Sequence, residues 1–293
     1  MMKFTEIQRE IEGFLGFGEV DFLKLKEDAI SLVYKVKFLS KTIEKQPIIV
    51  KVDLHDNGSL VSEANSLIYL FEFTKLPVPK VIKSSQKILA MSFIAGSTGT
   101  QNDVSAEIDL AVHLSALHNQ TATYFGFDFS TPLGGISQVN SKVDRWISFF
   151  GENRLLAIAE LAIRTNRISL QTLRKIEKLI VKLEELITEP EKPNLFHGDI
   201  WSGNIIVAEG KIAGFIDPAI SFAHRELELA LINLFNTAGK HFWKAYHERY
   251  PIEQGFWEER CEIYQLHPLL VHAALFGGHY SEAVSEQLKQ IGF

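Results

Sequence analysis

The segment from residue 194 to residue 221, NLFHGDIWSGNIIVAEGKIAGFIDPAIS, constrains the possible folds more than any other part of this chain. Three short apolar runs in it are typical of strands: Leu195–Phe196, Ile205–Val207 and Lys211–Ile216. Asp199, Asn204 and Asp217 lie in the loops that flank these runs. Loops held by a rigid scaffold are where polar groups converge on a ligand, so the segment predicts a polar site built on a small sheet.

The spacing of these three polar residues indicates which chemistry the site supports. Asp199 and Asn204 are five residues apart, the offset between the base and the metal-binding Asn in the catalytic loop of kinases, and Asp217 follows a strand, as the second metal carboxylate does there. Transfer of a γ-phosphoryl group needs carboxylate and amide oxygens to hold Mg²⁺, and a further carboxylate to accept the proton of the attacking hydroxyl. An isolated Asp-x-x-x-x-Asn is a common turn pattern, whereas His-Gly-Asp, Trp-Ser-Gly-Asn and Ile-Asp-Pro in succession are far more constrained.

The first third of the chain is predicted to consist of strands with one helix. Short apolar runs favour four strands, the first two forming a hairpin around a charged turn: Phe22–Leu25, Ser31–Phe38, Ile48–Val52 and Lys87–Phe93. Helical spacing over Leu60–Phe73 predicts one apolar face: Leu60, Ala64, Leu67, Ile68 and Phe71. Residues 1–94 are therefore expected to form a small antiparallel-sheet lobe with one key helix.

The remainder of the chain is predicted to be mostly helical. Ala95–Thr100 is flexible by composition and is the best candidate for a linker. Beyond it, apolar residues three and four apart predict helices at Ile108–His118 and Leu170–Ile187, and helices again from Arg225 to the C-terminus. The expected fold class is α+β, with residues 95–293 forming a helical second lobe into which a small sheet is inserted.

The strand Ile48–Val52 supplies what a nucleotide site on the first lobe would need. Alternation along a strand puts Ile49 and Lys51 on one face, where Ile49 packs on an adenine and Lys51 reaches the α- and β-phosphates. On the following helix Glu63 faces inward with Leu60 and Leu67, and a buried carboxylate needs a partner, for which Lys51 is the obvious candidate. The alternatives are a solvated edge lysine and a glutamate at the boundary of the core.

Composition narrows the class of protein further. With 30 Lys and Arg against 36 Asp and Glu, the net charge of −6 argues against a nucleic-acid partner, because phosphate contacts need a basic face. The single cysteine, Cys261, excludes a disulfide scaffold and a cysteine-based zinc site. Charged residues interrupt residues 1–17, and no apolar run approaches the roughly 18 residues of a membrane span. We therefore expect a soluble, cytoplasmic protein without a membrane partner.

These motifs together resemble the fructosamine (ketosamine) kinase family, which lies within the aminoglycoside phosphotransferase and choline kinase-like group of the protein kinase-like fold. The strings that carry the resemblance are His197–Asn204, Asp217–Ala219, His224–Ala230, Phe125–Phe127, Ser137–Asn140, Trp146–Phe150, Arg154–Leu155, Tyr264–Leu266 and Phe276–Gly278. The resemblance runs from about Val50 to Tyr280, nearly the whole chain.

The resemblance implies ATP- and Mg²⁺-dependent phosphorylation of a sugar hydroxyl on an amine-bearing sugar, a ketosamine. Asp199 would be the catalytic base, and Asn204 and Asp217 the Mg²⁺ ligands. Lys51, oriented by Glu63, would hold the α- and β-phosphates. Backbone groups at the adenine edge would come from four consecutive residues: Met91, Ser92, Phe93 and Ile94. Trp201 would form a wall for the sugar ring, or else only pack its own loop.

The turn Lys26–Ser31 departs from the usual kinase pattern. It has no glycine, whereas kinases commonly place glycines there so that backbone N–H groups approach the phosphates. The Ser31 hydroxyl is the candidate substitute, while Glu27 and Asp28 would repel phosphates. Three alternatives to a ketosamine kinase remain: a kinase of the same fold acting on an aminoglycoside or amino alcohol, a non-catalytic nucleotide-binding pseudokinase, which the missing glycines favour, and, more distantly, a metal-dependent phosphatase.

Overall fold

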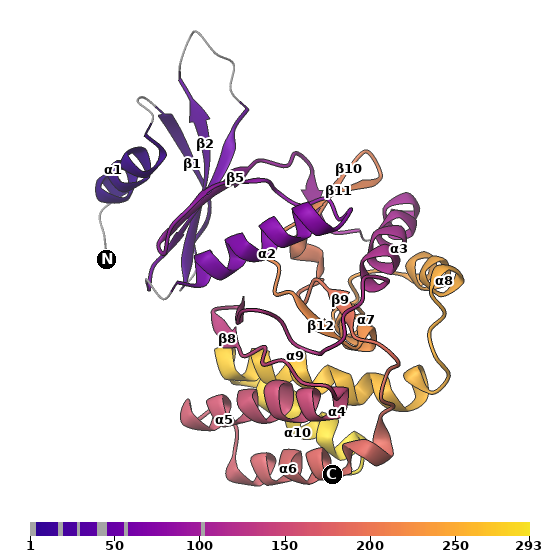
Figure 1. Ribbon diagram of the computed structural model, residues 1–293. Helices are drawn as coiled ribbons and strands as arrows, with labels where there is room; N and C mark the ends of the chain where they lie inside the picture. Colours follow the sequence, from indigo (N-terminus) through magenta and orange to yellow (C-terminus); the bar gives the residue numbers. More distant parts are fainter. Residues whose placement is uncertain (1–3, 17–19, 28–29, 40–45, 56–57, 101–102) are drawn as a thin grey trace.

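The structure is a computed structural model that describes residues 4–16, 20–27, 30–39, 46–55, 58–100 and 103–293, and it has two lobes (Figure 1). The N-terminal lobe contains these elements: α1 (Phe4–Leu15), β1 (Val20–Glu27), β2 (Ser31–Phe38), β3 (Ile48–Asp53), α2 (Ser59–Phe73), β4 (Val81–Ser84) and β5 (Ile88–Ser92). Its strands form one antiparallel sheet in the order β1-β2-β3-β5-β4. The predicted hairpin and the antiparallel sheet are confirmed, but the sheet has a fifth strand, β4, and the lobe has a second helix, α1, that the sequence pattern did not predict.

Strand alternation gives the two faces of this sheet different partners. Ile48, Val50 and Val52 of β3 are buried against α1, in a cluster that includes Ile7 and Ile11. The intervening residues face α2, so the register of β2 and β3 places Val33 opposite Lys51 and Lys35 opposite Ile49 on that second face. The sheet is thus covered by a helix on each side, and Lys51 lies on the side of α2.

The inward face of α2 differs in part from the prediction. Leu60, Ala64 and Leu67 are buried as expected, but Ile68 is 38% exposed and Phe71 is 52% exposed. Leu70 is fully buried in their place. Because the sheet covers only one side of this helix, the buried stripe is narrow, and residues one position around the helix from it reach solvent.

The C-terminal lobe is mostly helical, with three small sheets. Its helices are α3 (Val104–His118), α4 (Trp146–Ser148), a π-helical segment (Phe149–Leu156), α5 (Ala157–Arg164), α6 (Leu170–Leu186), α7 (Arg225–Leu234), α8 (Lys240–Arg249), a second π-helical segment (Phe256–Arg260), α9 (Cys261–Phe276) and α10 (His279–Gln290). Its strands are β6 (Ser97–Thr98), β7 (Thr131–Leu133), β8 (Ile136–Gln138), β9 (Asn194–Phe196), β10 (Ile205–Ala208), β11 (Lys211–Phe215) and β12 (Ser221–Ala223). They form the antiparallel groups β11-β10-β6, β12-β9 and β7-β8.

The segment predicted as a flexible linker is instead held in place. Ser97 and Thr98 form β6, which pairs with β10 at Val207 and Ile206. A Cβ on Gly96 would lie 2.4 Å from the Val207 carbonyl oxygen, and the buried Thr100 hydroxyl donates to the Thr237 carbonyl oxygen at 2.8 Å. Glycine permits close backbone approach as well as flexibility, and here the chain uses the first property, so the prediction of a flexible linker was wrong.

The core of the second lobe includes a cluster of aromatic rings around Trp146. Trp146, Phe149 and Phe150 are fully buried, so they act as packing residues. Helix α7 begins at Arg225, and its Glu226 receives two hydrogen bonds from Arg260, at 2.7 and 2.8 Å.

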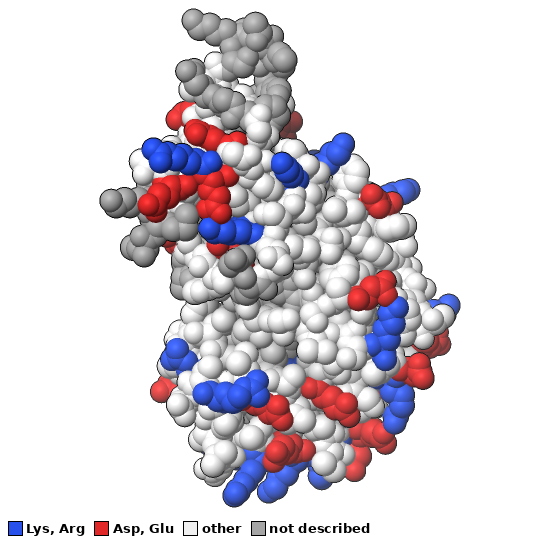
Figure 2. All heavy atoms as spheres, turned by 60° about the vertical axis from the view of Figure 1, so that its left-hand side comes forward, with Lys and Arg blue, Asp and Glu red and all other residues white. Residues whose placement is uncertain are grey.

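Charged side chains of both signs are intermixed over the face shown in Figure 2, and they are sparse in its middle. Within the described ranges, no helix is both long and apolar enough to span a bilayer.

Candidate active site

The three polar residues of the central segment are brought together by two loops that pack back to back. One loop joins β9 to β10 and carries Asp199, and the other joins β11 to β12 and carries Asp217. The Ala219 amide donates to the His197 carbonyl oxygen at 2.8 Å, and a Cβ on Gly198 would lie 2.1 Å from the Ala219 carbonyl oxygen. Gly198 also has a φ of 89°, so both its conformation and this contact require glycine.

Asn204 links the two loops. Its side-chain amide donates to the Asp199 carboxylate at 2.7 Å and to the Asp199 carbonyl oxygen at 3.0 Å. Its own carbonyl oxygen accepts a hydrogen bond from the Ile216 amide at 3.0 Å, directly before Asp217. Asp217 has a φ of 55°, a backbone conformation that side-chain-bearing residues adopt infrequently.

Lys51 connects the N-terminal lobe to this pair of loops. Its ammonium lies 2.7 Å from Oε2 of Glu63 on α2 and 3.1 Å from Oδ1 of Asp217. The predicted pairing of Lys51 with Glu63 is therefore present in the structure, and it extends to the second lobe. Burial opposes the charge on Lys51, but the two carboxylates outweigh it and raise the lysine pKa above its usual value.

The three carboxylates respond differently to this environment. Burial, followed by the nearby charge of Asp217, raises the pKa of Asp199 to about 7, against the hydrogen bond from Asn204. Burial likewise raises the pKa of Glu63 to about 7, although Lys51 opposes the shift. For Asp217 burial acts in the same direction, but Lys51 outweighs it and holds the pKa below its usual value. A carboxylate with a pKa near neutrality suits a general base, and an ionised one suits a metal ligand.

Beneath the Asp199 loop lies a buried anchor that sequence reasoning missed. Glu228 of α7 accepts hydrogen bonds from the Gly198 amide at 2.6 Å and from the His197 amide at 3.3 Å. Its carboxylate also lies 2.9 Å from Nε2 of His118 on α3, whose Nδ1 lies 2.7 Å from the Tyr246 hydroxyl on α8. Glu228 thus fixes the backbone that carries Asp199. The sequence showed Glu228 only within a family string and His118 only as the last residue of a predicted helix.

His197 supports the same loop as a neutral ring. It is fully buried, and burial lowers its pKa to about 4. The Asp199 amide donates to its Nδ1 at 3.3 Å, an interaction that requires an unprotonated acceptor nitrogen.

The predicted nucleotide residues lie on or beside the sheet face that carries Lys51. Ser31 of β2 lies opposite Asp53 of β3 and shares this face, and Ile49 packs in the cluster beneath α2. Met91 and Ser92 belong to β5, and the Ser92 amide donates to the Lys80 carbonyl oxygen. Strand β5 therefore extends through the first two of the four predicted adenine-edge residues.

Phe93 and Ile94 follow the end of β5. The Lys35 ammonium lies 3.5 Å from the centre of the Phe93 ring. A Cβ on Gly214 would lie 2.3 Å from Cδ1 of Ile94, so the Ile94 side chain packs closely on β11. Asp28, in the glycine-free turn, lies outside the described residues.

Trp201 has two roles in the structure. Its ring lies against Gly203, where an added Cβ would be 2.3 Å from the ring, so it does pack its own loop. It is nevertheless 44% exposed, and it lies close enough to Asp199 to oppose the rise in the pKa of that carboxyl. An exposed aromatic ring beside the candidate base is consistent with the predicted wall for a sugar.

The donor set fits Mg²⁺. The described residues include no group of three or more His, Cys, Asp and Glu side chains that would hold a metal ion by themselves. Asp217 and Asn204 instead offer a carboxylate and an amide oxygen, which suits a cation that takes its other ligands from water and phosphates. These two residues are the ones that would hold the ion.

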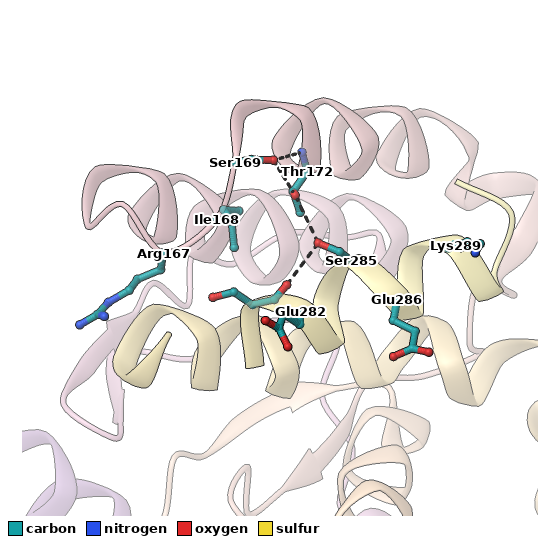
Figure 3. A pocket seen from close by; sticks show the side chains of 9 residues that line it. Arg167, Ile168, Ser169, Thr172, Glu282, Ser285, Glu286 and Lys289 are labelled. Carbon is teal, nitrogen blue, oxygen red and sulfur yellow. Dashed lines mark hydrogen bonds between the residues drawn. The ribbon is translucent and has the colours of Figure 1, made fainter. Parts of the chain in front are cut away.

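A cavity of about 590 Å³ lies elsewhere, between the start of α6 and helix α10 (Figure 3). Its lining includes Arg167, Thr172, Ser285 and Lys289, and the Thr172 and Ser285 hydroxyls lie 3.5 Å apart. None of the candidate site residues lines it, so this cavity is not where the chemistry described above takes place.

A two-lobed fold with a lysine–glutamate pair in the sheet lobe and an Asp–Asn–Asp constellation in the helical lobe defines a kinase of the protein kinase-like fold. The sequence model of the fructosamine kinase family matches residues 27–292. The chain belongs to this family. It is therefore a phosphotransferase with an alcohol acceptor, and the predicted family and fold class are confirmed.

Individual relatives agree with this assignment. A probable ketoamine kinase of Enterococcus faecium is 35% identical over 243 residues, covering 80% of this chain and 85% of the relative. A probable ketoamine kinase of Lactiplantibacillus plantarum is 30% identical, covering 82% and 85%. Among crystal structures, a "putative fructosamine-3-kinase" from Thermobifida fusca superposes with a TM-score of 0.85 at 27% identity, covering 99% of both chains. An aminoglycoside phosphotransferase, at a TM-score of 0.68 and 17% identity over 99% and 98%, shares the fold.

Proposed function

We propose that this protein transfers the γ-phosphoryl group of ATP to a sugar hydroxyl of a ketosamine, with Mg²⁺ as the metal. The observation that carries the proposal is the ion pair of Lys51 with Glu63 and Asp217, which joins the sheet of the first lobe to the Asp217 loop, packed against the Asp199 loop. The ketosamine acceptor is supported by the family match and by the relatives described as ketoamine kinases.

Each residue then has a role that follows from its position. Lys51, released in part from the carboxylates when the nucleotide binds, neutralises the α- and β-phosphates. Asp217 and Asn204 hold Mg²⁺, which screens the phosphate charge. Asp199 accepts the proton of the attacking hydroxyl, a step that its pKa of about 7 favours near neutral pH. Trp201 limits where the sugar ring lies, so that one hydroxyl faces Asp199.

The proposal is tested by ADP release from Mg-ATP across a panel of ketosamines, aminoglycosides and amino alcohols. We expect turnover with a ketosamine such as fructosyl-lysine and little with the other two classes. Turnover only with an aminoglycoside or an amino alcohol would overturn the acceptor assignment. No turnover with any acceptor, together with no thermal stabilisation by Mg-ATP, would overturn the kinase mechanism itself.

Substitution of the base sharpens this test. Asp199→Asn keeps the shape of the side chain but removes the proton acceptor, so kcat should fall by about 10²- to 10⁴-fold while Mg-ATP still stabilises the protein against heat. Asp21→Asn is the matched control, because Asp21 is exposed on β1 and undergoes the same change of charge. Equal kcat values for the two variants would show that Asp199 is not the base.

A further inference from the structure

The β7–β8 hairpin reaches from the second lobe to the turn between β1 and β2. Its two central residues, Gly134 and Gly135, have φ values of 56° and 86°, as a type I′ turn requires. A Cβ on Gly135 would lie 2.7 Å from Cδ1 of Ile30, directly before β2, and a Cβ on Gly134 would lie 2.6 Å from Cδ1 of Leu275 on α9. The tip of the hairpin is therefore in contact with both lobes.

The segment that precedes the hairpin pairs with the strands that carry the active-site loops. Gly126 exchanges two backbone hydrogen bonds with Phe222 of β12, at 2.8 and 2.9 Å. Strand β12 follows the Asp217 loop and pairs with β9, which leads into the Asp199 loop. In Figure 1 the hairpin, labelled at β8, lies below the strands of the first lobe. The segment from Gly126 to Gly135 thus connects the strands behind the Asp199 and Asp217 loops to Ile30, directly before β2.

A buried pair of side chains holds the two ends of the hairpin together. The fully buried Arg154 donates to Oδ1 of Asn140 at 2.6 Å and to the Val139 carbonyl oxygen at 3.1 Å, both after β8. The Asn140 amide donates in turn to the Phe129 carbonyl oxygen and to the Thr131 hydroxyl, each at 3.0 Å, at the start of β7. The chain from Arg154 through Asn140 therefore ties both strands to the core.

Arg154 is an unusual core residue. Among the residues that the structure describes, no carboxylate pairs with it, its Nε has no hydrogen-bond partner, and burial lowers its pKa to about 9. A buried cation without a counter-ion is costly, whereas an apolar side chain of similar size would fill the same space without that cost. The guanidinium lies over the Phe149 ring, 4.4 Å from its centre, and it supplies directional hydrogen bonds to the hairpin, which is typical of a positioning role.

We propose that Arg154 and Asn140 position the β7–β8 hairpin as a wall of the acceptor site, where it sets the affinity for the sugar part of the substrate. This rests on the proposed function. In the proposed reaction the acceptor hydroxyl has to reach Asp199 while the phosphates lie beneath the β1–β2 turn. The contact of Gly135 with Ile30 closes the space between Asp199 and this turn on the side of the hairpin. A sugar in that space lies against the hairpin.

The test is Asn140→Ala against Asn153→Ala in the full-length protein. Asn153 precedes Arg154 and donates one long hydrogen bond, at 3.4 Å, to the Val139 carbonyl oxygen, so it is a matched control. In Asn140→Ala we expect the KM for the ketosamine to rise by about five- to tenfold, as loss of one positioning hydrogen bond or more would produce, while the KM for ATP stays unchanged. Hydrogen exchange of residues 131–138 should accelerate in this variant and not in the control.

Asn140→Asp provides a second variant that keeps the acceptor for Arg154 and removes the two donated hydrogen bonds. We expect the same rise in the KM for the ketosamine, because the link to β7 is lost. Unchanged hydrogen exchange of residues 131–138 in both Asn140 variants would show that Arg154 and Asn140 do not hold the hairpin in place. Faster exchange with equal changes in the two KM values, or with none, would overturn the role as a wall of the acceptor site. If the wild type phosphorylates no ketosamine, the proposed function fails, and the role of the hairpin at the acceptor site fails with it. Hydrogen exchange still decides whether Arg154 and Asn140 hold the hairpin in place.

Discussion

Removal of the Lys51 side chain, by Lys51→Met, should destabilise the protein as well as inactivate it. Glu63 is 5% exposed, its Oε1 has no hydrogen-bond partner, and its Oε2 depends on Lys51 at 2.7 Å. Breaking a buried ion pair by removing one partner costs about 3–5 kcal/mol, and we expect the lower end because Asp217 is partly exposed. For a chain of this size, 3 kcal/mol corresponds to a fall in Tm of about 6–12 °C.

The size of this loss should depend on pH, with a sign set by Glu63. Burial raises the pKa of Glu63 to about 7 from its ordinary value of 4.5, and removal of Lys51 raises it further. A carboxyl whose pKa is higher in the folded state binds its proton more tightly there, so its contribution to stability is present at pH values below 4.5 and is lost as pH rises through the folded-state pKa. The Tm difference between Lys51→Met and the wild type should therefore be larger at pH 8 than at pH 6.

Thermal unfolding without nucleotide at these two pH values measures the effect. Lys35→Met, on the neighbouring strand and the same face, is the matched control, and loss of its contact with Phe93 should cost less than about 1 kcal/mol. The double variant Lys51→Met with Glu63→Met should recover most of the lost stability and remain inactive. The reasoning is refuted if Lys51→Met is as stable as the wild type at pH 8, or if the second substitution recovers nothing.

Three further results are expected. Gly198→Ala should lower the free energy of unfolding by more than about 2 kcal/mol in chemical denaturation, because the added Cβ would meet the Ala219 carbonyl oxygen. Gly13→Ala is the control: it lies in α1, its Cβ would have no atom within 4 Å, and it should raise the free energy of unfolding by up to about 1 kcal/mol. Glu228→Gln places an amide opposite the backbone donors that it serves, so steady-state kcat should fall by about tenfold with little change in the KM for ATP; an unchanged kcat would contradict the anchor. Asn204→Ala should raise the Mg²⁺ concentration for half-maximal activity by about tenfold, and an unchanged Mg²⁺ titration would exclude it as a ligand.

Short-range patterns predicted the parts of the site that depend on one element at a time. Strand alternation is local, so Ile49 and Lys51 could be placed on one face, and the i, i+4 geometry of a helix placed Glu63 beside Leu67. The spacing of Asp199 and Asn204 is also local, and their side chains are indeed hydrogen bonded. The roles of these residues in binding and catalysis stay predictions.

Contacts between distant segments could not be read in the same way. Glu228 lies 30 residues after the Gly198 amide that it binds, and His118 lies 110 residues before Glu228. A sequence does not distinguish a buried carboxylate from an exposed one. The packing of α3, α7 and α8 determines that Glu228 is buried. The Ala95–Thr100 segment failed for the same reason, because its pairing partner, β10, is more than 100 residues away.

The turn between β1 and β2 has no glycine, but Gly135 of the β7–β8 hairpin lies against Ile30, directly before β2. In most kinases glycines in the turn itself let its backbone approach the phosphates. Here Ile30 brings a bulky side chain to the turn, and the residue without a side chain is Gly135 on the hairpin, where a Cβ would lie 2.7 Å from Cδ1 of Ile30. Close approach between two segments requires a glycine on only one of them. Ile30 therefore approaches the hairpin closely because Gly135 has no side chain, and this contact needs no glycine in the turn itself.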